Sequence, residues 1–254
     1  MIRTEDLHKS FDGVEVLKGI TTEFYQGKTN LIIGRSGAGK TVLLKLLVGL
    51  FRPTSGRVWY DDVDLYSLNK KQLRNIRMQV GMLFQGSALF DSMTVEENVR
   101  FPLDMFTNKT RKEKLDRVNY CLERVNLEGV NSKFPSETSG GMQKRVGIAR
   151  SIVLGPKYLF CDEPNSGLDP KTSIVIDELI KSITEEQNIT TVINTHDMNS
   201  VMEIGENIVL LSNGQIAWRG NKSEVLTSDS DTLRDFIFAS PFLQKLRSTA
   251  LEKE

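Results

Sequence analysis

GRSGAGKT, at residues 34–41, is the stretch that decides the fold of this chain. It follows an apolar, strand-like run at residues 31–33 and opens a helix-like run at residues 42–48. A GxxxxGK[ST] pattern between a strand and a helix is typical of a phosphate-binding loop. Its glycines let backbone N–H groups curl around an anion, and the following helix points its positive end at the same anion. The stretch therefore predicts a nucleotide-binding α/β domain.

The polar residues of this loop have separate predicted roles. Lys40 would reach the β- and γ-phosphates as a point charge, and the Thr41 hydroxyl would ligate Mg²⁺. An ordinary glycine turn is the alternative, but the flanking strand and helix favour nucleotide binding. The nucleotide-binding residues predicted in the loop are Gly34, Ser36, Gly37, Gly39, Lys40 and Thr41.

The composition excludes several classes of protein. The chain has 254 residues, enough for one large α/β domain or two modest ones. Its 33 basic and 33 acidic residues balance, so we expect no nucleic-acid partner. The longest apolar run, at residues 42–51, is interrupted by Lys45 and is too short to span a bilayer. Because the N-terminus also lacks the layout of a secretory signal, any membrane role would come through a partner.

The two cysteines, Cys121 and Cys161, lie in a helix-like and a strand-like stretch. Their separation does not match the spacing of metal ligands. We therefore expect two buried, inert thiols in a reducing, cytosolic setting.

Turn signals and apolar periodicity organise the rest of the chain. The pairs Asp12-Gly13 and Asn213-Gly214 predict turns between short strands, the second of them a hairpin. Helical spacing of apolar residues over about residues 86–154 predicts a helical subdomain inserted into the nucleotide-binding core. The basic residues at 69–77 favour a solvated helix face over an anion site. Phe11 precedes the first turn, and it is either a core aromatic or a ring that stacks on an adenine.

Two strand ends carry residues suited to phosphate chemistry. The apolar strand at residues 158–161 closes with Asp162 and Glu163. Asp162 would hold Mg²⁺, and Glu163 would accept a proton from an attacking water. His196 ends the next predicted strand, where it would donate a polarising contact to the γ-phosphate. The alternatives are solvated carboxylates and a structural histidine, and the upstream phosphate loop favours the catalytic roles.

A second anion site is predicted where Ser139, Gly140 and Gly141 open a helix. The N–H groups of that helix end and the Ser139 hydroxyl can bind an anion. A simple glycine-rich helix cap is the alternative. Two phosphate sites are one more than a monomeric site needs, so this helix end is expected to complete the site of another subunit.

Together these motifs resemble the ATP-binding cassette (ABC) ATPases over nearly the whole chain. The shared order is GRSGAGKT, Gln85, TSGGM with QKRVGIAR, LFCDEP, SGLD and His196. The resemblance implies an α/β P-loop fold with a RecA-like core, an antiparallel β subdomain and an inserted α-helical subdomain. It also implies a homodimer that sandwiches two ATP molecules and hydrolyses them with Mg²⁺, each γ-phosphate touched by Ser139 and the glycines of the opposite subunit.

The resemblance assigns roles to three further residues. Gln85 would link Mg²⁺ and the attacking water to a membrane partner, which makes it both a catalytic and a metal-binding residue. Asp169 would lie at the subunit interface. Phe11 matches the position whose ring stacks on adenine, usually a tyrosine, so the stacking role is now favoured.

Departures from the family pattern narrow the resemblance. Thr138 and Met142 replace the leucine and glutamine of the common LSGGQ signature, and a glutamine contact would be lost. SGGM, together with residues 84–103, looks most similar to the ATPases of Mla/MCE-type phospholipid transport. The implied partners are integral-membrane permease subunits, a small regulatory subunit and a lipid-binding MCE protein, at the cytoplasmic face of the inner membrane. An importer ATPase for another solute is the alternative.

The predicted domain organisation follows from these assignments. Residues 1–230 would form the ATPase domain, with a core at about 1–85 and 155–230 and the helical subdomain at about 86–154. Residues 231–254 would form a C-terminal extension. Its apolar residues either pack on the core or dock on a second or regulatory subunit, and they include Leu233, Phe236, Ile237, Phe238, Phe242, Leu243 and Leu246.

Overall fold

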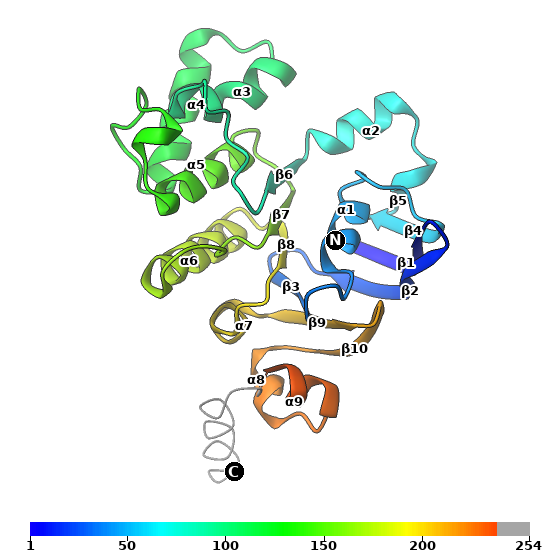
Figure 1. The fold of residues 1–254 in the computed structure, drawn as a ribbon. Helices are drawn as coiled ribbons and strands as arrows, with labels where there is room; N and C mark the ends of the chain where they lie inside the picture. The colour runs from blue at the N-terminus through cyan, green and yellow to red at the C-terminus, as the bar shows by residue number, and fades with distance from the viewer. Residues whose placement is uncertain (238–254) are drawn as a thin grey trace. The chain divides into compact units, whose positions relative to one another are not determined.

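The computed structural model describes residues 1–237 (Figure 1). These residues form two compact units, one of Met1–Ser67 with the chain from Thr190 onward, the other of Leu68–Ile189. Of the C-terminal apolar residues, Leu233 and Ile237 are buried, whereas Phe238, Phe242, Leu243 and Leu246 lie outside the described residues. The predicted boundaries of the helical subdomain and of the C-terminal extension remain predictions.

An antiparallel sheet with the strand order β2-β1-β4-β5 belongs to the first unit. Phe11 pairs with Val14 across the turn between β1 and β2, and Asp12 and Gly13 both have positive φ angles, of 47° and 81°. Two left-handed residues in a two-residue loop are the geometry that a tight hairpin needs, so the predicted turn is confirmed. The strands are β1 (Ile2–Phe11), β2 (Val14–Phe24), β4 (Ser55–Tyr60) and β5 (Val63–Asp64).

The first unit also contains the strands of a predominantly parallel sheet, in the order β10-β9-β3-β8. The central strand β3 pairs in parallel with both β8 and β9, and every residue of β3 and β8 is buried. Near-continuous apolar strands are expected where both faces of a parallel sheet are covered. Asn213 and Gly214 connect β9 to the antiparallel β10, as predicted. The strands are β3 (Thr29–Ile33), β8 (Thr190–Asn194), β9 (Asn207–Ser212) and β10 (Gln215–Gly220).

Helices follow these strands in the first unit. The phosphate loop leads from β3 directly into the helix α1, as the sequence predicts. The remaining helices of this unit are short. The helical elements of this unit are α1 (Lys40–Leu47), a 3₁₀ turn (Leu65–Ser67), α7 (Met198–Ile204), α8 (Lys222–Thr227) and α9 (Asp231–Ile237).

The second unit pairs the strands β6 and β7 in parallel and adds a group of helices. The helices α3, α4 and α5 pack against one another through buried apolar residues, which include Val99, Leu103, Val118, Leu122, Val146 and Ile152. This group is the predicted helical region. The elements are α2 (Lys70–Arg77), β6 (Val80–Leu83), α3 (Val95–Phe106), α4 (Arg111–Arg124), a 3₁₀ turn (Pro135–Glu137), α5 (Gly140–Ile152), β7 (Tyr158–Asp162) and α6 (Pro170–Glu186).

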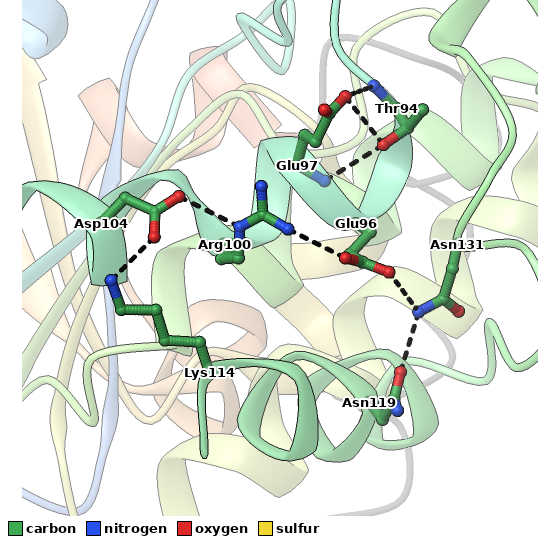
Figure 2. Close-up of polar contacts among 8 residues, drawn as sticks. All are labelled: Thr94, Glu96, Glu97, Arg100, Asp104, Lys114, Asn119 and Asn131. Atoms are coloured by element: carbon green, nitrogen blue, oxygen red, sulfur yellow. Dashed lines mark hydrogen bonds and ion pairs between the residues drawn. The ribbon is translucent and has the colours of Figure 1, made fainter. Parts of the chain in front are cut away.

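A polar network ties α3 to α4 (Figure 2). Arg100 donates to Glu96 at 2.9 Å and to Asp104 at 3.0 Å along α3, and Lys114 of α4 donates to Asp104 at 2.9 Å. Asn131 donates to Asn119 of α4 at 2.8 Å. A single exposed ion pair adds little to the free energy of unfolding. The contribution of this network comes from Asp104, which is shared by Arg100 of α3 and Lys114 of α4.

Two further predictions are tested by burial. The basic helix α2 has no buried residue, which confirms a solvated helix over residues 70–77. Cys121 and Cys161 are free and buried, and burial raises the pKa of both thiols, that of Cys121 to about 11. Among residues 1–237, no helix is both long enough and apolar enough to cross a membrane.

Candidate active site

The phosphate loop of the first unit needs glycine at two positions for steric reasons. Gly34 has a φ of +146°, and a Cβ there would lie 2.4 Å from the carbonyl oxygen of Leu211. Gly39 has a φ of +101°, and a Cβ there would lie 2.7 Å from Leu17 Cδ2. Between them, the residues at 35–37 are exposed. The loop is therefore anchored at both ends and open to solvent at its tip, as a loop that binds an anion through backbone N–H groups must be.

Lys40 begins α1 and is 9% exposed. Its Nζ donates to the carbonyl oxygens of Gly34, at 2.8 Å, and Arg35, at 3.4 Å. The ammonium group is thus held inside the curl of the loop by the loop's own backbone. A cation in this position can exchange a carbonyl partner for a phosphate oxygen, which forms a stronger, charge-assisted hydrogen bond. Thr41, the predicted Mg²⁺ ligand, follows Lys40 and is exposed.

Phe11 ends β1 and is 37% exposed, so it is not a core aromatic. Its ring makes an edge contact with the ring of Phe51, with 5.5 Å between centroids. Lys9 Nζ lies 4.7 Å from the centroid of the Phe11 ring. An exposed aromatic ring with a nearby cation is suited to stacking on a planar base.

His196 stands between the buried strand β8 and the helix α7. Its neighbours fix the turn: Asp197 N donates to Thr195 Oγ1 at 3.0 Å, and the Asp197 carboxylate accepts from Asn199 N at 2.9 Å as the cap of α7. The imidazole itself is exposed. The carboxyl end of a parallel strand therefore presents His196 at the surface, where ligands bind in open α/β sheets.

In the second unit, β7 ends in the predicted acidic pair. Asp162 is 8% exposed, and Glu163 has a φ of +50°. A left-handed backbone at a non-glycine residue is uncommon and persists only where the surroundings enforce it, often at functional sites. Lys144 of α5 supplies nearby positive charge; burial lowers the pKa of its ammonium, while Glu163 and Asp162 act to raise it. Gln85 follows β6, is exposed, and donates from Nε2 to Ser166 Oγ at 3.3 Å.

The start of α5 has the predicted glycine-rich cap. Ser139 Oγ accepts a hydrogen bond from Met142 N at 3.3 Å, and Ser139 and Gly140 are exposed. At Gly141 a Cβ would lie 2.7 Å from Thr172 Cγ2, so the close approach of α6 requires glycine there. Asp169 caps α6, and hydrogen bonds from Thr172 lower the pKa of its carboxyl group. The local cap is confirmed, and a second anion site at this helix end remains a prediction.

The predicted site residues are thus divided between the two units. The first unit brings the phosphate loop, Phe11 and His196 to its surface, and the second carries Gln85, Asp162, Glu163 and the start of α5. Among residues 1–237, no cluster of three or more His, Cys, Asp or Glu side chains could hold a metal ion alone. Thr41, Gln85 and Asp162 remain the predicted Mg²⁺ donors. Each offers a side-chain oxygen, and Mg²⁺ takes few protein oxygens and completes its shell with phosphates and water.

Sequence reasoning did not single out Lys144 or Ser166. Both contact Gln85 and the Glu163 backbone, and Lys144 is only 5% exposed. A lysine on a helix that carries other charged residues is normally predicted to be solvated. The signal that could have found it is its position one turn before Ile148, on an apolar face of the helix.

Known proteins resemble this chain in sequence and in structure. The family model described as "ABC transporter" matches residues 17–166. A probable ribonucleotide transport ATP-binding protein, mkl, of Mycobacterium leprae is 39% identical over 236 residues, which cover 93% of this chain and 68% of the relative. The methionine import ATP-binding protein MetN of Carboxydothermus hydrogenoformans is 41% identical over 228 residues, covering 89% of this chain and 67% of the relative. The chain thus spans about two thirds of these curated relatives.

Two solved structures share the fold. The dimeric structure of MJ0796, a bacterial ABC transporter cassette, superposes with a TM-score of 0.80 at 32% identity, and the match covers 87% of this chain and 99% of the cassette. cbiO1 from Clostridium perfringens, part of the ABC transporter complex cbiONQ, gives a TM-score of 0.83 at 30% identity, with coverage of 97% and 98%. These similarities extend over both units of the chain.

Proposed function

This chain belongs to the ABC transporter family as an ATP-binding subunit that hydrolyses ATP, and we propose that it powers the import of a small solute across a membrane. The observation that carries the import proposal is the identity of about two residues in five, over nearly the whole chain, with a protein named for methionine import. The membrane partners of such an ATPase would determine which solute is carried.

The proposed chemistry is the transfer of the γ-phosphoryl group of ATP to water. Lys40 and the loop N–H groups hold the phosphates, and Phe11 stacks on the adenine. Glu163 accepts a proton from the attacking water as the new P–O bond forms and the bond to ADP breaks. His196 donates to the γ-phosphate, and Gln85 orients the water. Thr41, Gln85 and Asp162 would hold Mg²⁺, which would supply positive charge to neutralise the phosphates.

The proposed active form is a homodimer in which each ATP contacts both chains. Ser139 and Gly141 of one chain complete the site that the phosphate loop of the other begins. Two observations support this arrangement: the exposed, serine-capped start of α5, and the likeness to a cassette whose solved structure is dimeric. ATP-driven closure of the dimer would do mechanical work, and hydrolysis would reset it.

Permease subunits are the proposed membrane partners, at the cytoplasmic face of the inner membrane. Support comes from exposed apolar residues in the second unit, near Gln85 in sequence and along α3. Phe84, Phe90 and Met105 are 40%, 41% and 56% exposed. Exposed apolar groups of this size suit docking to another protein. The likeness to cbiO1, itself part of a transporter complex, supports such an assembly.

Phospholipid transport of the Mla/MCE type is the second candidate function. It is favoured by the SGGM variant of the signature at residues 139–142 and by the segment at residues 84–103. Under this proposal the partners would also include a small regulatory subunit and a lipid-binding MCE protein, and the C-terminal extension would contact one of them.

One experiment separates the two candidates. The chain would be purified with its membrane partners, and the complex would be analysed for bound lipid and for ATPase stimulation by small solutes. Stimulation by a solute such as methionine, without enriched phospholipid, supports import. Enriched phospholipid together with an MCE protein supports lipid transport and overturns the import proposal.

A further inference from the structure

A closed ring of hydrogen bonds in the second unit joins three segments that are distant in sequence. Lys144 of α5 donates from Nζ to the backbone carbonyl of Gln85 and, at 3.4 Å, to the backbone carbonyl of Glu163. The same Glu163 carbonyl accepts from Ser166 N at 3.2 Å. Ser166 Oγ accepts from Gln85 Nε2 at 3.3 Å, which closes the ring.

Lys144 is an unusual residue in this position. It is 5% exposed, and a buried ammonium is costly unless its donors are satisfied. Here the acceptors are two backbone carbonyls from the loops after β6 and β7. An apolar residue could fill the same space without that cost. The arrangement therefore points to a role in holding the two loops rather than in stabilising the core.

Both loops need such restraint. Glu163 has a φ of +50°, and Ser87 and Ala88 in the loop after β6 have φ angles of +59° and +48°. Non-glycine residues in this region relax unless the surroundings hold them. Arg150, further along α5, donates to the carbonyls of Ser87 and, at 2.7 Å, Ala88. One helix thus fixes the backbone of both loops with two cations.

We propose that Lys144 is a positioning residue for ATP hydrolysis. Its ammonium fixes the backbone of Gln85 relative to the backbone of Glu163, and Ser166 closes the ring of hydrogen bonds. The inference rests on the proposed roles of Gln85 and Glu163 in orienting and deprotonating water. Because Ser139 caps the start of α5, the ring also connects these two residues to the helix end proposed to contact the partner's nucleotide. Release of the ring would leave ATP binding by the phosphate loop intact and misplace the groups that act on water.

The test uses the full chain with Mg-ATP and compares variants of the ring with a control. Lys144→Met keeps the apolar stem and removes the donors, Lys144→Gln keeps two N–H donors, and Ser166→Ala opens the ring elsewhere. Arg145→Met is the matched control, because Arg145 donates to the carbonyls of Val125 and Asn126, away from the ring. The measurements are kcat, the Kd for ATP and the unfolding temperature.

We expect Lys144→Met to lower kcat by about 10- to 100-fold while the Kd for ATP changes by less than about twofold, because small misplacements of catalytic groups are costly. Lys144→Gln should recover most of the loss. Ser166→Ala should also lower kcat, and combining it with Lys144→Met should add little, since both open one ring. Arg145→Met should leave kcat unchanged.

A Lys144→Met protein with wild-type kcat, or one whose kcat falls only as far as in Arg145→Met, would overturn the inference. If Lys144→Met does not fold, an unchanged kcat in Ser166→Ala would do the same. Glu163→Gln separates this failure from a failure of the proposed function. If Glu163→Gln retains turnover, the proposed catalytic site is wrong. If Glu163→Gln has no turnover while Lys144→Met is fully active, only the positioning role of Lys144 is wrong.

Discussion

Gly34 passes the backbone of Leu211 so closely that a Cβ on Gly34 would lie 2.4 Å from the Leu211 carbonyl oxygen. The first residue of the phosphate loop is therefore seated against the end of β9. The packing of this strand end and the shape of the loop cannot change independently.

Gly34→Ala should destabilise the protein by more than about 1 kcal/mol, because the new Cβ collides with backbone and the φ of +146° is strained for alanine. Thermal unfolding measures the loss. Gly86→Ala is the control, since a Cβ at Gly86 meets nothing within 4 Å. Equal unfolding temperatures for the two variants would contradict the steric argument.

Glu163→Gln should bind ATP normally and lose turnover by about 10²- to 10⁴-fold, the range for removing a general base. With hydrolysis blocked, the nucleotide-bound dimer should accumulate. Gel filtration with Mg-ATP, alongside a phosphate-release assay, would detect both effects. A monomer with wild-type turnover would sink the catalytic assignment.

Ser139→Ala should bind ATP normally yet hydrolyse it poorly, because Ser139 is proposed to act on the partner's nucleotide. Mixing it with Lys40→Ala chains should produce dimers with at most one working site. ATPase titration of one variant into the other gives the activity per dimer. Recovery of full wild-type activity would rule out shared sites.

His8 should make the stability of the first unit depend on pH. Its Nδ1 lies 2.7 Å from Glu15 Oε1 and its Nε2 lies 3.1 Å from Asp6 Oδ1, and the hydrogen bonds to Glu15 and then Asp6 raise the pKa of His8 above 6.5. A raised pKa stabilises the fold fully below pH 6.5 and loses that effect as pH rises through the folded-state pKa.

His8→Gln should therefore lower the unfolding temperature at pH 6, with a smaller loss at pH 8.5. Unfolding scans of both proteins across this range provide the measurement, and NMR titration of the His8 ring reports its pKa directly. Glu15→Gln should lower that pKa toward 6.5. A His8→Gln effect that is constant with pH would show that the ring acts through packing alone.

Arg100→Met should cost about 1 kcal/mol of stability in the second unit, because Arg100 joins Glu96 and Asp104 in the network between α3 and α4. Urea unfolding would measure the change, with exposed Lys112→Met as the control. High salt should reduce the difference by screening. An undiminished loss in 1 M NaCl would assign it to the packing of the Arg100 stem.

Much of the fold could be predicted from local patterns in the sequence. The strand, loop and helix around Gly34–Thr41, the Asn213-Gly214 hairpin and the helix after Ser139 all depend on short-range chemistry, and the structure confirms them. The surface position of Phe11 could be known only from the fold, because an isolated aromatic residue in a sequence is equally compatible with the core.

Lys144 shows why the rest of the site stayed hidden. Its acceptors are backbone carbonyls at Gln85 and Glu163, and every residue type has a carbonyl, so no side-chain pattern marks them. Only the packing of α5 against two strand ends reveals that this lysine points inward. Contacts between side chain and backbone across long sequence separations are the part of a site that a motif does not encode.

The pairing of β3 has a consequence for how the protein is made. Thr29 pairs with Thr191 and Asn30 with Asn207. The strand before the phosphate loop therefore cannot complete its pairing until residues far downstream in the sequence have been synthesised. At about 5–20 residues per second, that wait on the ribosome is on the order of ten seconds or more. Residues 68–189, which form their own compact unit, emerge during this interval. Residues 68–189 can thus begin to fold before the parallel pairing of β3 is complete.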